Sequence, residues 1–171
     1  MKRILILVTL FSLTCLTTAL AQPAASRGTA SVEISGKKIT IEYGRPQLKG
    51  RDMLGQAYEG MVWRMGMNQQ TTLTTEATLQ FGDQTIAAGE YLLVAQKKGP
   101  RDWDLIVNSD PSASANTRNT SQDVARIPLT PSEPPSSVET FTIELTAKGD
   151  QGGTFSMSWG DLLASADFQV K

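Results

Sequence analysis

The sequence predicts an all-β fold: a single antiparallel β-sandwich, or flattened barrel, of about nine strands. Short segments in which apolar and polar residues alternate follow one another from Ser31 to the C-terminus. This period of two residues is that of a half-buried strand. Turn signals, most of them containing glycine, separate the segments at short intervals, which is typical of antiparallel sandwiches and barrels.

The domain begins with a predicted hairpin. Val32 and Ile34 alternate with polar neighbours and Gly36-Lys37 supplies the turn, after which one face of the second strand carries Ile39, Ile41 and Tyr43. A loop-rich segment then interrupts the alternation. Strand character returns in residues 71–76 and 77–81, where threonine is frequent.

The next strand is predicted to lie at the centre of the fold. Both of its faces are apolar, which is typical of a strand buried between layers; they are formed by Tyr91, Leu92, Leu93, Val94 and Ala95. The run Lys97-Lys98-Gly99-Pro100 is predicted to be an exposed turn. Along the following strand, Trp103, Leu105 and Val107 occupy one face, and Asp104 and Ile106 occupy the other.

The C-terminal third contains a loop, an extended segment and three strands. Residues 109–122 are polar, and we expect a mobile loop with no apolar anchor. Residues 128–137 are rich in proline and serine and should be extended. The last strands place these residues on their apolar faces: Phe141, Ile143 and Leu145; Phe155, Met157 and Trp159; Ala164, Ala166, Phe168 and Val170.

The first 21 residues have the pattern of a cleaved signal peptide. Lys2 and Arg3 precede an apolar run, and Ala19-Leu20-Ala21 is a small-residue cleavage site. Cys15 raises the alternative of a lipoprotein, but the residues before it match such a site poorly. We therefore predict cleavage after Ala21, a flexible tether at 22–29, a single domain at 30–171, and export to the periplasm or the extracellular space.

Composition excludes several classes of function. Loss of Lys2 and Arg3 from the 16 basic residues leaves 14 against 17 acidic ones, a charge of −3, which argues against a nucleic-acid partner. The mature chain has no hydrophobic span for a membrane. It has no histidine, and its one cysteine lies in the predicted signal peptide. Ser-His-Asp triads, thiol nucleophiles and zinc sites with His or Cys ligands are therefore excluded.

The loop-rich segment from Tyr43 to Leu73 is the candidate ligand site. Its cations would converge on an acidic sugar, a phosphorylated group or a peptide carboxylate, because guanidinium groups suit such anions. Neutral hydrogen bonds and an apolar wall would complete a site formed by Tyr43, Arg45, Lys49, Arg51, Trp63, Arg64 and Asn68. The alternative is structural: these cations would hold loop carbonyls and pair with Glu42, Asp52 or Glu59.

Two other groups of residues favour structural interpretations. Asp102 and Asp104 share a strand face, but nearby cations would keep both ionised, so a solvated face is favoured over a catalytic pair. The methionines lack the histidine partner usual at copper sites and are interpreted as core filler: Met53, Met61, Met65 and Met67. We predict no cofactor and no metal. Trp103 and Trp159 are predicted to be core residues, whereas Trp63 stays ambiguous.

Six short motifs, in order, resemble the bacterial domain-of-unknown-function family 2911. They are Tyr43 with Arg45-Pro46, Lys49-Gly50-Arg51, Val62-Trp63-Arg64, Gly66 with Asn68 and Thr71-Thr72, Ala88-Gly89 with Tyr91, and the segment from Trp103 to Asn108. The resemblance covers the chain from about Ala30 to the C-terminus. It implies an exported all-β domain and no established activity.

These observations predict a non-catalytic binding or interaction module with an anion-binding loop site. Its partner would be a small anionic ligand, a glycan or an envelope protein. The alternative is an envelope hydrolase that acts on a glycan or an ester through carboxylate and arginine chemistry. A purely structural accessory domain is the third possibility.

Overall fold

The computed structural model describes residues 27–171. The predicted signal peptide, its cleavage site after Ala21 and residues 22–26 of the predicted tether lie outside the described residues. The first strand begins at Arg27, three residues before the predicted domain start at Ala30. It extends this far because its partner strand runs to Gly44, which pairs with Arg27.

The described chain is built almost entirely of strands, which confirms the all-β prediction. Within residues 27–171 there is no α-helix, only the 3-10 turn η1 (Thr120–Gln122). The strands are β1 (Arg27–Ile34), β2 (Lys37–Gly44), β3 (Val62–Trp63), β4 (Thr71–Thr75), β5 (Leu79–Phe81), β6 (Gln84–Ile86), β7 (Gly89–Lys97), β8 (Trp103–Asn108), β9 (Asp123–Ser132), β10 (Val138–Lys148), β11 (Gly152–Gly160) and β12 (Leu162–Val170).

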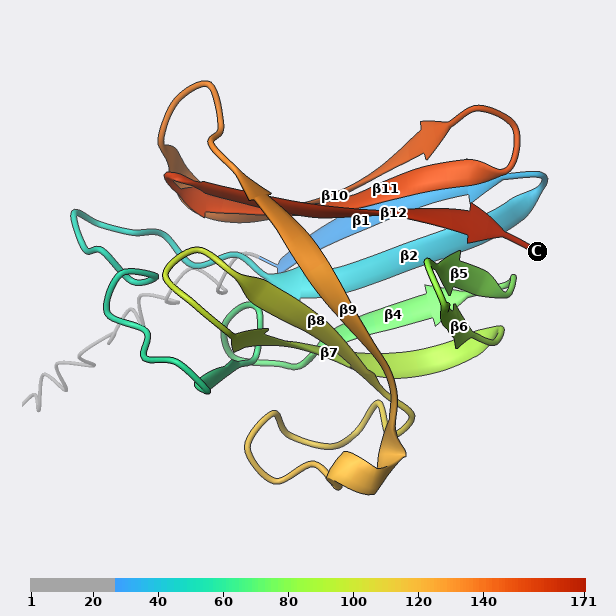
Figure 1. The fold of residues 1–171 in the computed structure, drawn as a ribbon, viewed down its shortest axis with the longest axis horizontal. Helices are drawn as coiled ribbons and strands as arrows, with labels where there is room; N and C mark the ends of the chain where they lie inside the picture. The colour runs from blue at the N-terminus through green and yellow to red at the C-terminus, as the bar shows by residue number, and fades with distance from the viewer. Residues whose placement is uncertain (1–26) are drawn as a thin grey trace, which may run out of the picture.

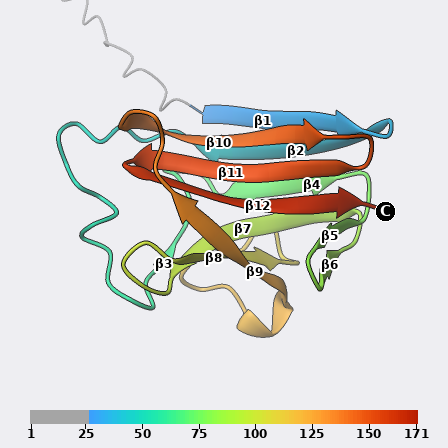
Figure 2. The same cartoon turned by 45° about the horizontal axis from the view of Figure 1, so that its top comes forward.

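All strand pairs are antiparallel and form one sheet folded over on itself. The main order is β1-β2-β4-β7-β8-β9-β12-β11-β10, and the short strands β3, β5 and β6 attach beside it. β9 crosses diagonally between the two layers and pairs with β8 in one and β12 in the other (Figure 1). The end strands β1 and β10 lie side by side, so the sheet is a flattened, nearly closed barrel (Figure 2).

The end of β2 and the residues that follow it connect this layer to β10 of the other layer. The Tyr43 hydroxyl donates to the Ile143 carbonyl of β10 at 3.2 Å. Gln47 then forms a bridge with Thr140, and the Leu48 amide donates to the Glu139 carbonyl at 3.0 Å. These contacts attach the start of the long loop after β2 to the opposite layer.

One apolar core fills the barrel, and the predicted alternation is confirmed on its strands. Side chains from both layers meet there, and the largest fully buried ones include Trp103, Phe141, Phe155 and Phe168. The extended segment predicted from residue 128 is part of β9 up to Ser132. Proline is tolerated there because β9 has a partner on one side only at each proline: Pro128 pairs with β8 and Pro131 with β12.

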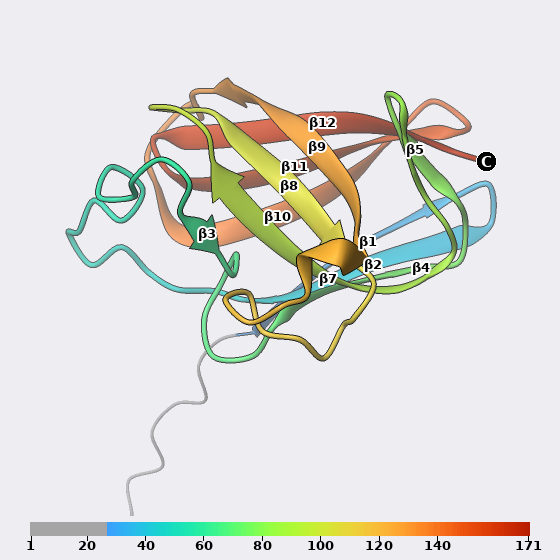
Figure 3. The same cartoon turned by 60° about the horizontal axis from the view of Figure 1, so that its bottom comes forward.

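The prediction that residues 109–122 lack an apolar anchor is wrong. This loop folds back over the outer face of β7 and β8 (Figure 3), where Ala115 is 6% exposed and packs with Leu92, Val94 and Ile106. A single alanine in a polar run carries little hydrophobic signal, so the sequence does not reveal this contact. The loop therefore supplies the second layer that the two apolar faces of β7 require.

Polar contacts hold the same loop in place. The buried Asn108 side chain donates to the Asn119 carbonyl at 2.9 Å and to Asp123 Oδ1 at 2.8 Å. Arg118 forms an ion pair with Asp123 at 3.1 Å and donates to the Ala115 carbonyl at 3.0 Å. A buried amide and a largely buried guanidinium are thus both supplied with acceptors, as buried polar groups require.

Replacement of Tyr43 by phenylalanine tests the closure between the layers. The variant loses the hydrogen bond to the Ile143 carbonyl and keeps the ring in the core, so we expect a loss of about 1 kcal/mol in the free energy of unfolding. Urea denaturation measures it. Tyr58→Phe is the matched control, because Tyr58 is 72% exposed. An equal effect of both substitutions would contradict this account of barrel closure.

Candidate functional site

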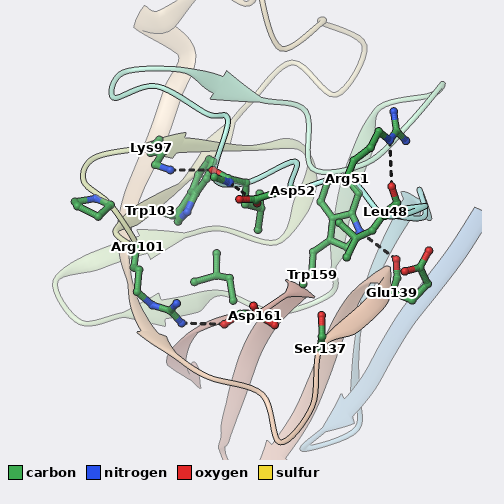
Figure 4. A pocket seen from close by; sticks show the side chains of 16 residues that line it. Leu48, Arg51, Asp52, Lys97, Arg101, Trp103, Ser137, Glu139, Trp159 and Asp161 are labelled. Carbon is green, nitrogen blue, oxygen red and sulfur yellow. Dashed lines mark hydrogen bonds between the residues drawn. The ribbon is translucent and has the colours of Figure 1, made fainter.

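A cleft of about 530 Å³ lies at one end of the barrel. Its lining comes from four segments that are distant in sequence: 48–55 after β2, 97–103 around the β7–β8 turn, 137–139 at the start of β10, and 159–162 at the β11–β12 turn. Figure 4 shows these side chains around the opening. We call this feature the end cleft.

Five aromatic rings pack beside and beneath the end cleft; this aromatic cluster comprises Tyr43, Trp63, Trp103, Phe141 and Trp159. The half-buried Trp63 stacks on Trp159, with ring centroids 5.5 Å apart and an interplanar angle of 11°. It also meets Phe141 edge-on at 4.7 Å. Trp103 and Trp159 are buried, as predicted, and both line the cleft.

Lys97 brings a cation into the cleft wall from the last position of β7. It is only 6% exposed, so the prediction of an exposed turn at Lys97-Lys98-Gly99-Pro100 is wrong for its first residue. The reason lies in the strand period: Tyr91, Leu93, Ala95 and Lys97 share the inward face. The Lys97 Nζ donates to the Leu54 carbonyl at 2.9 Å and lies 5.6 Å from the centroid of the Trp103 ring.

Two arginines add cations at the rim and also tie loops together. Arg101 Nη2 donates to the carbonyls of Ser132 and Asp161, both at 2.9 Å. Arg51 Nε donates to the Leu48 carbonyl at 3.0 Å. Figure 4 shows Lys97 and Arg101 on one side of the opening and Arg51 on the other.

Three carboxylates balance these cations. Asp52, Glu139 and Asp161 all line the cleft. Asp52 Oδ1 accepts from the Gly55 amide at 2.8 Å, and Glu139 Oε1 accepts from the Lys49 amide at 2.9 Å. The lining therefore offers hydrogen-bond donors and acceptors over an aromatic floor, the composition of a site for a polar organic ligand.

Three of the seven sequence-predicted site residues belong to this end of the barrel. Arg51 lines the cleft, and Tyr43 and Trp63 belong to the aromatic cluster. Tyr43 is 3% exposed, so its ring serves the core. Arg51 also holds loop carbonyls, as the structural alternative expects.

The other four residues lie outside the cleft lining. Arg64 donates to the Asn68 carbonyl at 3.3 Å, and Lys49 contributes its amide to Glu139. Arg45 Nε is buried and has no hydrogen-bond partner within residues 27–171. Of the four predicted cations, only Arg51 lines the end cleft, and contact of these cations with a ligand stays a prediction.

Sequence reasoning missed Lys97, Arg101, Glu139 and Asp161 as members of a site. A signal existed for Lys97, because it continues the inward phase of Tyr91, Leu93 and Ala95. No such sequence signal exists for Glu139 and Asp161. They come from β10 and from the turn after β11, and only the strand topology brings them to the same opening.

Two carboxyls outside the cleft lining have lowered pKa values. Hydrogen bonds from Lys148 and then Thr154 lower the pKa of Asp167, and hydrogen bonds from Ser112 lower that of Asp110. Asp104, of the predicted Asp102 and Asp104 pair, forms an ion pair with Arg126 at 3.2 Å.

Within residues 27–171, no helix is long and apolar enough to cross a membrane.

The chain matches, over residues 25–168, the model of a family described as a protein of unknown function, DUF2911. The chain belongs to this family. The match confirms the resemblance drawn from the six motifs. No curated protein and no solved structure matches the chain.

Replacement of Trp63 by alanine tests whether the aromatic cluster supports this end of the DUF2911 domain. We expect a loss of about 3 kcal/mol in the free energy of unfolding, because the change leaves a cavity beneath Trp159. Trp63→Phe keeps an aromatic ring against Phe141 and should cost clearly less. Chemical denaturation and near-ultraviolet circular dichroism measure both variants. Equal costs, or no cost, would contradict the supporting role.

Proposed function

We propose that this domain is a non-catalytic binding module that holds a small polar organic ligand of saccharide size in the end cleft. The observation that carries the proposal is the cleft itself, whose volume of about 530 Å³ is within the range of small-molecule sites. The small exposed parts of Trp103 and Trp159 would contact the apolar side of a sugar ring. Arg51, Arg101 and Glu139 would bond its hydroxyl groups.

The structure of the floor supports binding without a large rearrangement. The Trp63–Trp159 stack and the Trp159 Nε1 bond to the Glu139 carbonyl, at 3.3 Å, fix the rings before any ligand arrives. A preorganised site avoids part of the entropy cost of binding. The loops around the opening are also tied to the barrel, through Lys97 on one side and Glu139 on the other.

The cleft carboxylates favour binding over hydrolysis. A glycosidase needs one carboxylic acid that protonates the leaving group and a second carboxylate placed opposite it. Asp52 and Glu139 each accept a hydrogen bond from a loop amide, so both serve the structure of the loop. No contact within residues 27–171 favours the hydrolase alternative specifically.

The proposal also includes export to the periplasm or the extracellular space. It rests on the signal-peptide pattern of residues 1–21. In that setting the available saccharide ligands are those of the cell envelope or of the surroundings. An envelope protein that displays such a group would be an equivalent partner.

A thermal-shift screen of the purified protein tests the binding role. The panel holds neutral sugars, acidic sugars, sugar phosphates and short peptides. We expect saturable stabilisation by at least one sugar class. A ligand present at a hundred times its Kd raises the free energy of unfolding by about 2.7 kcal/mol. Ser137→Trp should abolish the shift, because an indole at this lining position fills the cleft.

Ser136→Trp is the matched control, since Ser136 is an exposed neighbour outside the lining. It should retain the ligand response. The binding proposal fails if no member of the panel gives a saturable shift, or if both tryptophan variants respond to the ligand like the unmodified protein.

A further inference from the structure

Lys97 is a buried cation whose bonding is incomplete. The residue is 94% buried, and a lysine ammonium carries three N–H donors. Its Nζ has one hydrogen-bond acceptor, the Leu54 carbonyl, and the Trp103 ring as its π contact. Lysines are almost never this buried unless they are paired, because removing the charge from water is costly.

The neighbouring groups do not neutralise this charge. None of the ion pairs within residues 27–171 includes Lys97. Asp52 lies on the same cleft but uses Oδ1 to accept the Gly55 amide. Lys97 also lines the cleft, so a ligand bound there would lie beside this residue.

Arg101 offers further donors on the same side of the opening (Figure 4). Its Nη2 is occupied by two carbonyls, which fixes the guanidinium plane. Its Nε and Nη1 have no partner within the described part of the chain. A fixed guanidinium and a buried ammonium together suit an oxyanion, since charge-assisted hydrogen bonds are the strong ones.

From these contacts we infer that Lys97 and Arg101 bind the oxyanion of an acidic saccharide, a carboxylate or a phosphate carried by the sugar. This inference rests on the proposed binding function and names the ligand class for that site. The oxyanion supplies the counter-charge that Lys97 lacks. The sugar ring then extends over Trp159 toward Ser137 and Glu139, where hydroxyls find polar partners.

The competing explanation is that Lys97 serves only to hold the loop through the Leu54 carbonyl. Both explanations predict that a substitution at Lys97 affects stability. They differ in the ligand: only the oxyanion site makes discrimination between charged and neutral sugars depend on Lys97. The test therefore compares ligands, with stability used only to verify folding.

The experiment measures binding of glucose, glucuronate and glucose 6-phosphate by tryptophan fluorescence at constant ionic strength, because Trp103 and Trp159 line the cleft. We expect glucuronate or glucose 6-phosphate to bind at least about tenfold more tightly than glucose. Lys97→Met keeps an unbranched apolar stem. It should raise the Kd of the preferred acidic sugar by about tenfold to a hundredfold, as expected for the loss of one charge-assisted contact. Comparison of the two acidic sugars tells a carboxylate site from a phosphate site.

Lys98→Met is the matched control, because Lys98 is the exposed adjacent lysine. It should leave the preference unchanged. Asp52→Asn keeps the side-chain shape and removes a negative charge from the cleft, so it should tighten binding of the acidic sugar. This variant keeps the inference testable if Lys97→Met does not fold.

The outcomes separate the two proposals. Binding of glucose as tight as that of the acidic sugars overturns the oxyanion site and leaves the binding function intact. Equal losses in Lys97→Met and Lys98→Met, or no tightening in Asp52→Asn, also overturn it. No saturation with any of the three sugars overturns the acidic-saccharide inference, and the binding function is then decided by the other members of the thermal-shift panel.

Discussion

The stack of Trp63 on Trp159 joins the two layers at the end of the barrel that carries the cleft. Trp63 belongs to β3, which pairs with β7 of one layer, whereas Trp159 is the last residue but one of β11 in the other. The loop between β2 and β3 contains little regular structure of its own. Its conformation therefore depends on this stack, on the bridge of Gln47 to β10 and on the Lys97 bond to Leu54.

The cleft is a consequence of that arrangement. Because the loop is attached at its start, its middle and its end, it surrounds the barrel opening instead of collapsing into it. The same attachments place polar groups from opposite layers around one space of about 530 Å³. Lys97 belongs to both parts of the structure: it is the last inward-facing residue of β7, and it also lines the cleft.

Much of the fold could be predicted from the sequence, because alternation of period two is read from neighbouring residues. It placed Trp103, Phe141 and Trp159 in the core correctly. Strand partners could not be predicted in this way, since β9 pairs with β8 and β12 through contacts distant in sequence. The cleft was missed for the same reason, since its lining comes from segments distant in sequence. Lys97 was missed because the run Lys-Lys-Gly-Pro indicates an exposed turn, although Lys97 lies on the inward face of its strand.

Nuclear magnetic resonance of lysine side chains tests the central claim directly, namely that Lys97 is a ligand-accessible buried cation lacking a counter-charge. The protein, labelled with ¹³C at lysine Cε, is titrated with inorganic phosphate at constant ionic strength, and the Lys97 signal is assigned by its loss in Lys97→Met. The account predicts a saturable shift of that signal, with Lys98 unaffected. Lysine signals that all move together without saturation, or a Lys97 signal that does not move, would contradict it.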